Sequence, residues 1–199
     1  MKKALLVCAA VVVMAGLVAA PLAAATKVNF GLKAGASFAN NLWSDDDGLE
    51  KTLVRPTFGA FALIELSPTL ALQPEVNYLV TGEWWTDVTK FVEAYTYLHI
   101  PVLLRARLMK EGKVIPVVFA GPAISFLLSA KEGGDDVKSF YRSTDFGADF
   151  GAGAEMAAGT MKVIFDARYY LGLTNAYSFA PTKFNMKNRG FLVTVGLIF

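Results

Sequence analysis

His99 and Ser125 are the residues whose types could together support nucleophilic catalysis. His99 is the only histidine among the 199 residues, and Ser125 falls on the same face of the next strand in the pattern described below. A histidine base beside a serine hydroxyl is the pair that many acyl-transfer enzymes use. A histidine between Tyr97 and Pro101 on a polar strand face is more simply a structural side chain, so we expect no catalytic residue and no enzyme activity.

Metal and cofactor chemistry has little support in the sequence. A single histidine excludes a histidine-rich metal site. The acidic runs at 45–47 and 135–136 could attract Ca²⁺, but they lack the ligand spacing of a calcium loop, and solvated loop acids are the alternative. The glycine pairs at 133–134 and at 151 and 153 precede no strand-to-helix transition, which a nucleotide loop needs. We therefore expect no metal site and no cofactor.

Residues 1–25 have the features of a cleavable secretory signal peptide. Two lysines at 2–3 precede an apolar run at 4–20, and alanines at 23–25 supply the small residues of a cleavage site. A single membrane anchor is the alternative, against which Pro21 favours cleavage. Cys8, the only cysteine, lies inside this segment. The mature chain, residues 26–199, is therefore expected to have no thiol and no disulfide.

The composition is too apolar for an ordinary soluble domain. Hydrophobic residues make up 54% of the chain and charged residues only 18%, whereas soluble domains have about a quarter charged residues. Loss of Lys2 and Lys3 reduces the 19 basic residues to 17, which equals the 17 acidic ones. A net charge of zero removes the electrostatic argument for a nucleic-acid partner.

Eight later segments alternate apolar and polar residues with period two, which is typical of strands. They cover residues 27–38, 54–66, 70–81, 92–108, 114–130, 145–156, 161–171 and 190–199. The connections alternate between short ones (67–69, 109–113, 157–159) and long ones (40–53, 82–91, 132–144, 174–188). This predicts an all-β fold, an eight-stranded antiparallel up-and-down transmembrane β-barrel with its long loops outside the cell. A soluble lipocalin-like barrel is the alternative.

The charged residues lie on the strand face that also carries most of the glycines. The interior of an eight-stranded barrel has room only for side chains, so glycines between long charged groups fit a filled lumen. Seven basic residues match seven acidic ones in the predicted lumen charge network: Lys27, Lys33, Arg55, Arg105, Arg107, Lys162, Arg168, Glu65, Glu75, Glu93, Asp145, Asp149, Glu155 and Asp166. A two-residue turn between Ala157 and Thr160 would pair Glu155 with Lys162 and Asp149 with Arg168.

Several stretches resemble a known family. They are GLKAG at 31–35, LQPEVNY at 72–78, YLHIPVLL at 97–104, FAGP at 119–122 and the terminal Phe199. Together they are similar to small bacterial outer-membrane β-barrel proteins of the porin or PorT-like type. The resemblance implies an outer-membrane barrel. We expect such a barrel to contact outer-membrane lipids and lipopolysaccharide and to be a monomer. The resemblance also implies that Phe199 belongs to the C-terminal signal that the barrel-assembly machinery reads.

Aromatic residues gather near two of the long connections. Trp84, Trp85, Phe91 and the tyrosines at 95 and 97 surround the second, and Trp43 lies in the first. An interfacial girdle and packing inside a folded loop both account for this placement.

These observations favour an integral outer-membrane protein with a structural or surface-interaction role, in which the four long loops form the working surface. A narrow porin-like channel for small solutes is the first alternative, supported by the glycine-rich wall at 145–156. A lipid-modifying enzyme that uses His99 is the second.

Overall fold

The computed structural model describes residues 27–43, 51–86, 90–178 and 186–199. Eight long strands dominate these residues: β1 (Lys27–Trp43), β2 (Lys51–Glu65), β3 (Leu70–Thr86), β4 (Lys90–Arg107), β5 (Val114–Glu132), β7 (Thr144–Ala158), β8 (Met161–Gly172) and β9 (Met186–Ile198). Two short elements, β6 (Asp135–Asp136) and the 3₁₀ turn η1 (Lys138–Phe140), lie between β5 and β7. The predicted signal peptide and Asp45 to Asp47 lie outside the described residues.

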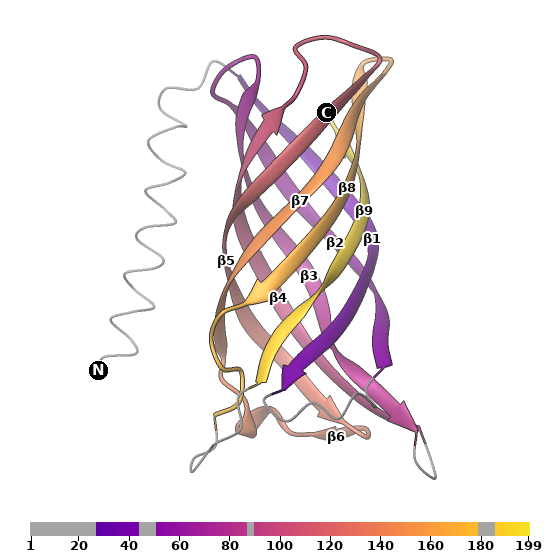
Figure 1. The fold of residues 1–199 in the computed structure, drawn as a ribbon, viewed down its shortest axis with the longest axis vertical. Helices are drawn as coiled ribbons and strands as arrows, with labels where there is room; N and C mark the ends of the chain where they lie inside the picture. The colour runs from indigo at the N-terminus through magenta and orange to yellow at the C-terminus, as the bar shows by residue number, and fades with distance from the viewer. Residues whose placement is uncertain (1–26, 44–50, 87–89, 179–185) are drawn as a thin grey trace, which may run out of the picture.

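The eight long strands close into an antiparallel barrel, which confirms the predicted fold (Figure 1). Each strand pairs with its neighbours in the chain, β5 pairs with β7, and the pairing of β1 with β9 completes the ring. The two-residue β6 adds to the end of β5. Closure gives each long strand a partner on both sides, so the backbone groups of the wall are satisfied within the sheet.

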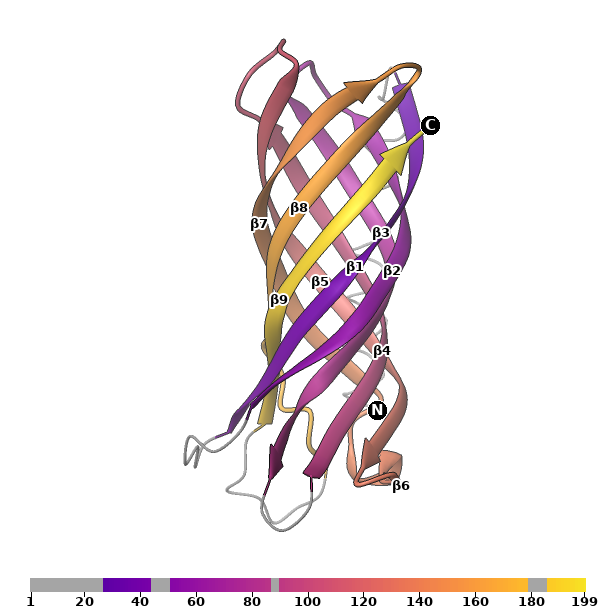
Figure 2. The same cartoon turned by 90° about the vertical axis from the view of Figure 1, so that its right-hand side faces the viewer.

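The two ends of the barrel differ. One end of the barrel carries the short turns that follow β2, β4 and β7, together with the C-terminus (Figures 1 and 2). It is here called the turn end. The opposite end, called the loop end, carries β6 and η1. Within the described ranges, no helix has the length and apolar character needed to cross a membrane.

Two of the expected long loops are shorter than predicted. β1 continues to Trp43, β3 continues to Thr86 and β4 begins at Lys90, so strand residues occupy much of 40–53 and 82–91. Cross-strand pairs such as Trp85 with Phe91 extend the ladder beyond Gly82, into residues that the sequence pattern predicts as a loop. Aromatic cross-strand pairs stabilise such extensions.

The outer wall is apolar and the inside is polar. Large hydrophobic side chains such as Phe30, Leu32 and Phe191 are 58–65% exposed. Charged side chains such as Glu75 and Arg105 are instead 2% and 1% exposed. This distribution is the reverse of that in a water-soluble barrel, and it suits a wall that faces hydrocarbon.

Inward glycines make room for large rings inside the barrel. A Cβ atom on Gly31 would lie 2.3 Å from the ring of Phe61, and one on Gly151 would lie 2.9 Å from the ring of Phe119. Both distances are shorter than real carbon contacts allow. These two glycines therefore allow phenylalanine rings to pack among the charged groups that fill the lumen.

Candidate functional site

A cluster of four charged side chains, here called the central cluster, crosses the middle of the lumen. It consists of Lys33 on β1, Glu75 on β3, Asp149 on β7 and Arg168 on β8. Lys33 Nζ lies 2.5 Å from Glu75 Oε2. Arg168 donates to both oxygens of Glu75 at 2.8 Å and to Asp149 Oδ2 at 3.2 Å. The four side chains are at most 3% exposed, so strands on opposite sides of the barrel are joined by ion pairs shielded from water.

Glu75 also accepts hydrogen bonds from neutral neighbours on its own strand. Gln73 Nε2 donates to Glu75 Oε1 at 2.7 Å, and Asn77 Nδ2 donates to Glu75 Oε2 at 2.9 Å. Residues two apart on a strand share a face, which brings the three side chains together. The predicted network omitted both amides, although their period-two spacing from Glu75 was a usable signal.

A second group of charges, the turn-end cluster, lies nearer the short turns. Arg105 Nε donates to Glu155 Oε1 at 2.8 Å, and Arg105 Nη1 donates to Asp166 Oδ1 at 3.0 Å. Arg107 Nε donates to Glu155 Oε2 at 2.8 Å, and its Nη1 and Nη2 donate to Glu65 at 2.6 and 2.8 Å. Glu155 therefore bridges two arginines, and Arg107 forms a bidentate pair with the partly buried Glu65.

Phe119 connects the two clusters. The guanidinium carbon of Arg105 lies 5.4 Å from the centre of the Phe119 ring, and that of Arg168 lies 5.3 Å from it. Both distances are within the range of cation–π attraction. The ring, which is buried, thus lies against one arginine of each cluster.

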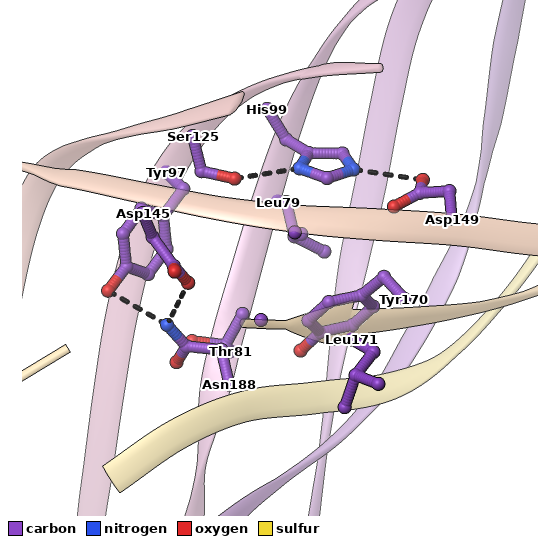
Figure 3. Close-up of a pocket in the computed structure, with 12 residues that line it drawn as sticks. Leu79, Thr81, Tyr97, His99, Ser125, Asp145, Asp149, Tyr170, Leu171 and Asn188 are labelled. Atoms are coloured by element: carbon purple, nitrogen blue, oxygen red, sulfur yellow. Dashed lines mark hydrogen bonds and ion pairs between the residues drawn. The ribbon is translucent and has the colours of Figure 1, made fainter. Parts of the chain in front are cut away.

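Towards the loop end, His99 lies between Ser125 and Asp149 in a small cavity (Figure 3). His99 Nδ1 is 2.8 Å from Ser125 Oγ, and His99 Nε2 is 3.0 Å from Asp149 Oδ2. On the other side of the cavity, Asn188 Nδ2 donates to Asp145 Oδ2 at 2.9 Å and to Tyr97 Oη at 3.2 Å. The structure thus brings His99 and Ser125 together, and it adds a carboxylate that the sequence interpretation did not connect with them.

Serine, histidine and aspartate are the residue types of a hydrolytic triad, but the cavity around them lacks the space through which a substrate would reach such a triad. The centre of a water molecule could move within a volume of about 10 Å³ in this cavity. The cavity therefore has room for about one water molecule. A serine nucleophile needs space for an acyl substrate and for oxyanion donors. Asp149 also accepts from Arg168, so the histidine belongs to the hydrogen-bond chain of the central cluster.

Near the loop end, three hydrogen-bonded residues inside the barrel form a tyrosine cap, which we define as Tyr95, Glu132 and Tyr141. The two tyrosine hydroxyls are 2.8 Å apart, and Tyr141 donates to Glu132. Tyr95 donates its one hydroxyl proton to Glu93 at 2.8 Å, and its oxygen lies 3.2 Å from Glu132 Oε1. Burial raises the pKa of the Tyr141 hydroxyl above its ordinary value, and its hydrogen bond to Glu132 raises it further. Tyr141 therefore stays protonated and serves as a donor.

Two connections hold the cap in place. Tyr141 follows η1 and forms an isolated bridge with Tyr177, and the backbone N–H of Arg142 donates to the carbonyl of Ala176 at 2.8 Å. The rings of Tyr95 and Tyr141 are 4.7 Å apart. Tyr95 and Tyr97 are buried inside the barrel, so an interfacial girdle is the wrong interpretation for these two. Trp85 and Phe91 instead pack against each other, with ring centres 4.8 Å apart.

Five of the fourteen residues in the predicted network lie outside the central and turn-end clusters. Lys27 and Lys162 are exposed, because Lys27 begins β1 and Lys162 follows the turn after β7. Arg55 is partly buried and donates to the carbonyl of Val54 at 3.2 Å. The structure places Glu93 beside Tyr95, and Asp145 accepts from Asn188 and Thr174.

The predicted register between β7 and β8 is also wrong. Ala158 pairs with Met161, which makes Gly159 and Thr160 the two-residue turn. Gly159 has φ of +65°, a conformation that glycine adopts without strain. Glu155 therefore pairs with Ile164 instead of Lys162. Asp149 still contacts Arg168, but diagonally, because its direct partner is Tyr170.

Among the described residues, no group of three or more histidine, cysteine or acidic side chains is arranged to hold a metal ion. Asp135 and Asp136 form the exposed β6. The backbone N–H of Lys138 donates to Asp136 Oδ1 at 2.9 Å, so this carboxylate stabilises the turn that leads into η1.

The apolar wall, the closed antiparallel sheet and the polar lumen define a transmembrane β-barrel. Residues 20–178 match the family of the outer membrane protein beta-barrel domain. The chain belongs to this family and is a protein of the Gram-negative outer membrane. A finer assignment to PorT-like proteins stays a prediction.

Solved structures show the same fold. Neisserial surface protein A (NspA) is similar with a TM-score of 0.57 and 17% identity, over 86% of this chain and 98% of that one. OprG from Pseudomonas aeruginosa is similar with a TM-score of 0.55 and 10% identity, over 86% of this chain and 95% of that one. A comparison with curated protein sequences found no match.

Proposed function

We propose that this protein is a closed, non-enzymatic outer-membrane barrel with a structural or surface-interaction role. The loop end would face the outside of the cell and carry the interacting surface. The observation that carries the proposal is the central cluster. There the Glu75 carboxylate accepts hydrogen bonds from Lys33 Nζ and from Nη1 and Nη2 of Arg168, which reaches it across the lumen.

An open channel would need a continuous path of water through the lumen. Such a path would meet the turn-end cluster, the central cluster and the tyrosine cap in succession. Removal of one partner of a buried ion pair costs about 3–5 kcal/mol, so thermal opening of several such pairs at once is rare. These contacts favour a filled lumen over the porin-like alternative.

Planar-bilayer recording tests this proposal. The mature chain is refolded in detergent, folding is verified by the heat-dependent shift in gel mobility, and the protein is reconstituted into a bilayer. We expect no discrete conductance steps from the folded barrel. Reproducible openings that scale with the amount of folded protein would instead support the narrow channel.

The lipid-modifying alternative is tested separately with His99→Ala and Ser125→Ala. We expect lipid A from cells that carry either variant to have the same mass profile as lipid A from cells with the original protein. A species that disappears in both variants, while the barrels remain folded in the membrane, would establish an enzyme and overturn the non-enzymatic role.

A further inference from the structure

A groove of about 480 Å³ lies on the outer wall near the loop end. It follows the seam between β9 and β1, which lie side by side facing the viewer in Figure 2. Phe38 and Phe191 are direct partners across this seam. The ring of Tyr169 on β8 packs edge-on against Phe191, with centres 4.9 Å apart. These three rings form the apolar side of the groove.

Polar side chains line the groove on the side of the loop end. Arg189 and Asn40 are also direct partners across the seam, and each precedes or follows the aromatic pair by two residues, a step of about 7 Å along a strand. Thr52 on β2 completes this side. None of the described residues that line the groove is acidic.

Arg189 differs from the arginines inside the barrel. Arg105, Arg107 and Arg168 are each paired with carboxylates, whereas within the described ranges no acidic side chain forms an ion pair with Arg189. It is partly exposed on the face that Phe191 shares. Lys187, two residues further towards the loop end, adds a second outward cation.

The depth of Arg189 in the membrane follows from its neighbours. Aromatic rings on the outside of a barrel collect at the boundary between hydrocarbon and headgroups. A charge on the lipid-facing wall costs about 2–4 kcal/mol at the midplane and little near the boundary. The row formed by Phe38, Phe191 and Tyr169 therefore places Arg189 at headgroup level, where a guanidinium can bind a phosphate through two parallel hydrogen bonds.

We propose that this groove binds one phosphorylated lipid of the outer leaflet. Arg189 holds the headgroup phosphate, Asn40 and Thr52 offer further hydrogen bonds to the headgroup, and an acyl chain lies against the aromatic rings. The match between an anionic headgroup and an outward cation that has no ion-pair partner among the described residues carries the assignment. It does not depend on whether the lumen is closed, because the groove is on the opposite face of the wall.

Native mass spectrometry of the full, folded chain in detergent micelles tests the site, with diphosphorylated lipid A as the probe. We expect one retained lipid, and we expect Arg189→Gln to weaken its binding about tenfold, the effect of losing one charge-assisted contact. Arg142→Gln is the matched control, because it makes the same substitution at an exposed arginine of the loop end that does not line the groove. Asn40→Asp, which sets a negative charge beside Arg189, should also weaken binding.

Two further arms identify the source of the phosphate. Lipid A stripped of its phosphates should bind about tenfold more weakly than the diphosphorylated form, and millimolar inorganic phosphate should not displace the bound lipid. Equal losses in Arg189→Gln and Arg142→Gln, or equal retention of the stripped lipid, would overturn the site. Displacement by free phosphate would overturn its assignment to a lipid. Heat-dependent gel mobility checks that each variant is folded. If Arg189→Gln does not fold, the binding of lipid A by Asn40→Asp provides the test.

Discussion

The central cluster and the tyrosine cap both fill the lumen with polar side chains, but different parts of the chain hold them. Every member of the central cluster lies on a long strand, and its contacts are charge-assisted. The cap depends on Tyr141, which lies in the connection between β5 and β7 and is hydrogen-bonded to Tyr95 and Glu132. The middle of the lumen is therefore held by residues of the barrel wall, whereas the cap also depends on contacts of a connection, which open at a lower free-energy cost.

Glu75→Ala should have the largest effect on stability. The change leaves Lys33 and Arg168 buried without their main carboxylate, and it removes the acceptor of Gln73 and Asn77. We expect a loss of about 3–5 kcal/mol in the free energy of unfolding, measured by urea titration of the folded barrel in lipid vesicles. Glu111→Ala, which removes an exposed carboxylate at the turn end, is the control. Equal midpoints for the two variants would show that the central cluster does not stabilise the barrel.

Arg168→Ala should be destabilising by about 3 kcal/mol for the complementary reason, since Glu75 loses a bidentate partner and Asp149 loses a donor. The double variant Glu75→Ala with Arg168→Ala should then lose about 1–3 kcal/mol less than the sum of the single losses. The original protein, the two single variants and the double variant form a double-mutant cycle, and all four are unfolded under the same conditions. Strictly additive losses would mean that the two side chains stabilise the fold independently.

Tyr141→Phe should have a smaller and local effect. The ring packing against Tyr95 and Tyr177 remains, and only the hydroxyl contacts with Tyr95 and Glu132 are lost, which costs about 1 kcal/mol. Hydrogen exchange should accelerate at the N–H of Arg142, which bonds to Ala176, and should stay slow in β8. Faster exchange throughout the barrel would show that the cap is coupled to the central cluster.

The difference between these regions also explains what the sequence could predict. Alternation with period two places Glu75, Arg105, Asp149 and Arg168 on the inner face without knowledge of any loop, because strand direction alone decides the face. The partners across the lumen do not follow from it. Lys33 and Glu75 are 42 residues apart and lie on strands that flank β2, while Glu75 and Arg168 are 93 residues apart and meet only because the closed ring places β3 opposite β8.

The cap had no comparable signal. Tyr141 lies in a segment without periodicity, and its position is set by the turn at η1 and by contacts with Tyr177 that come from another connection. The groove at Arg189 was missed for a different reason. Its strand begins at Met186, whereas the expected strand was 190–199 and the expected connection was 174–188, so Arg189 fell between the two and was not assigned to the wall.

Lys162→Ala should have the smallest effect and tests the register of the last hairpin. If Lys162 were paired with Glu155, removal of the lysine would leave the buried Glu155 carboxylate with one cation fewer. The loss in the free energy of unfolding would then approach that of Arg107→Ala, which removes another cation from Glu155. In the structure, Glu155 receives its hydrogen bonds from Arg105 and Arg107, and Lys162 is exposed beside the turn. We therefore expect a change within about 0.5 kcal/mol in the free energy of unfolding. A loss above about 1 kcal/mol, well beyond what an exposed surface charge contributes, would favour the alternative turn between Ala157 and Thr160.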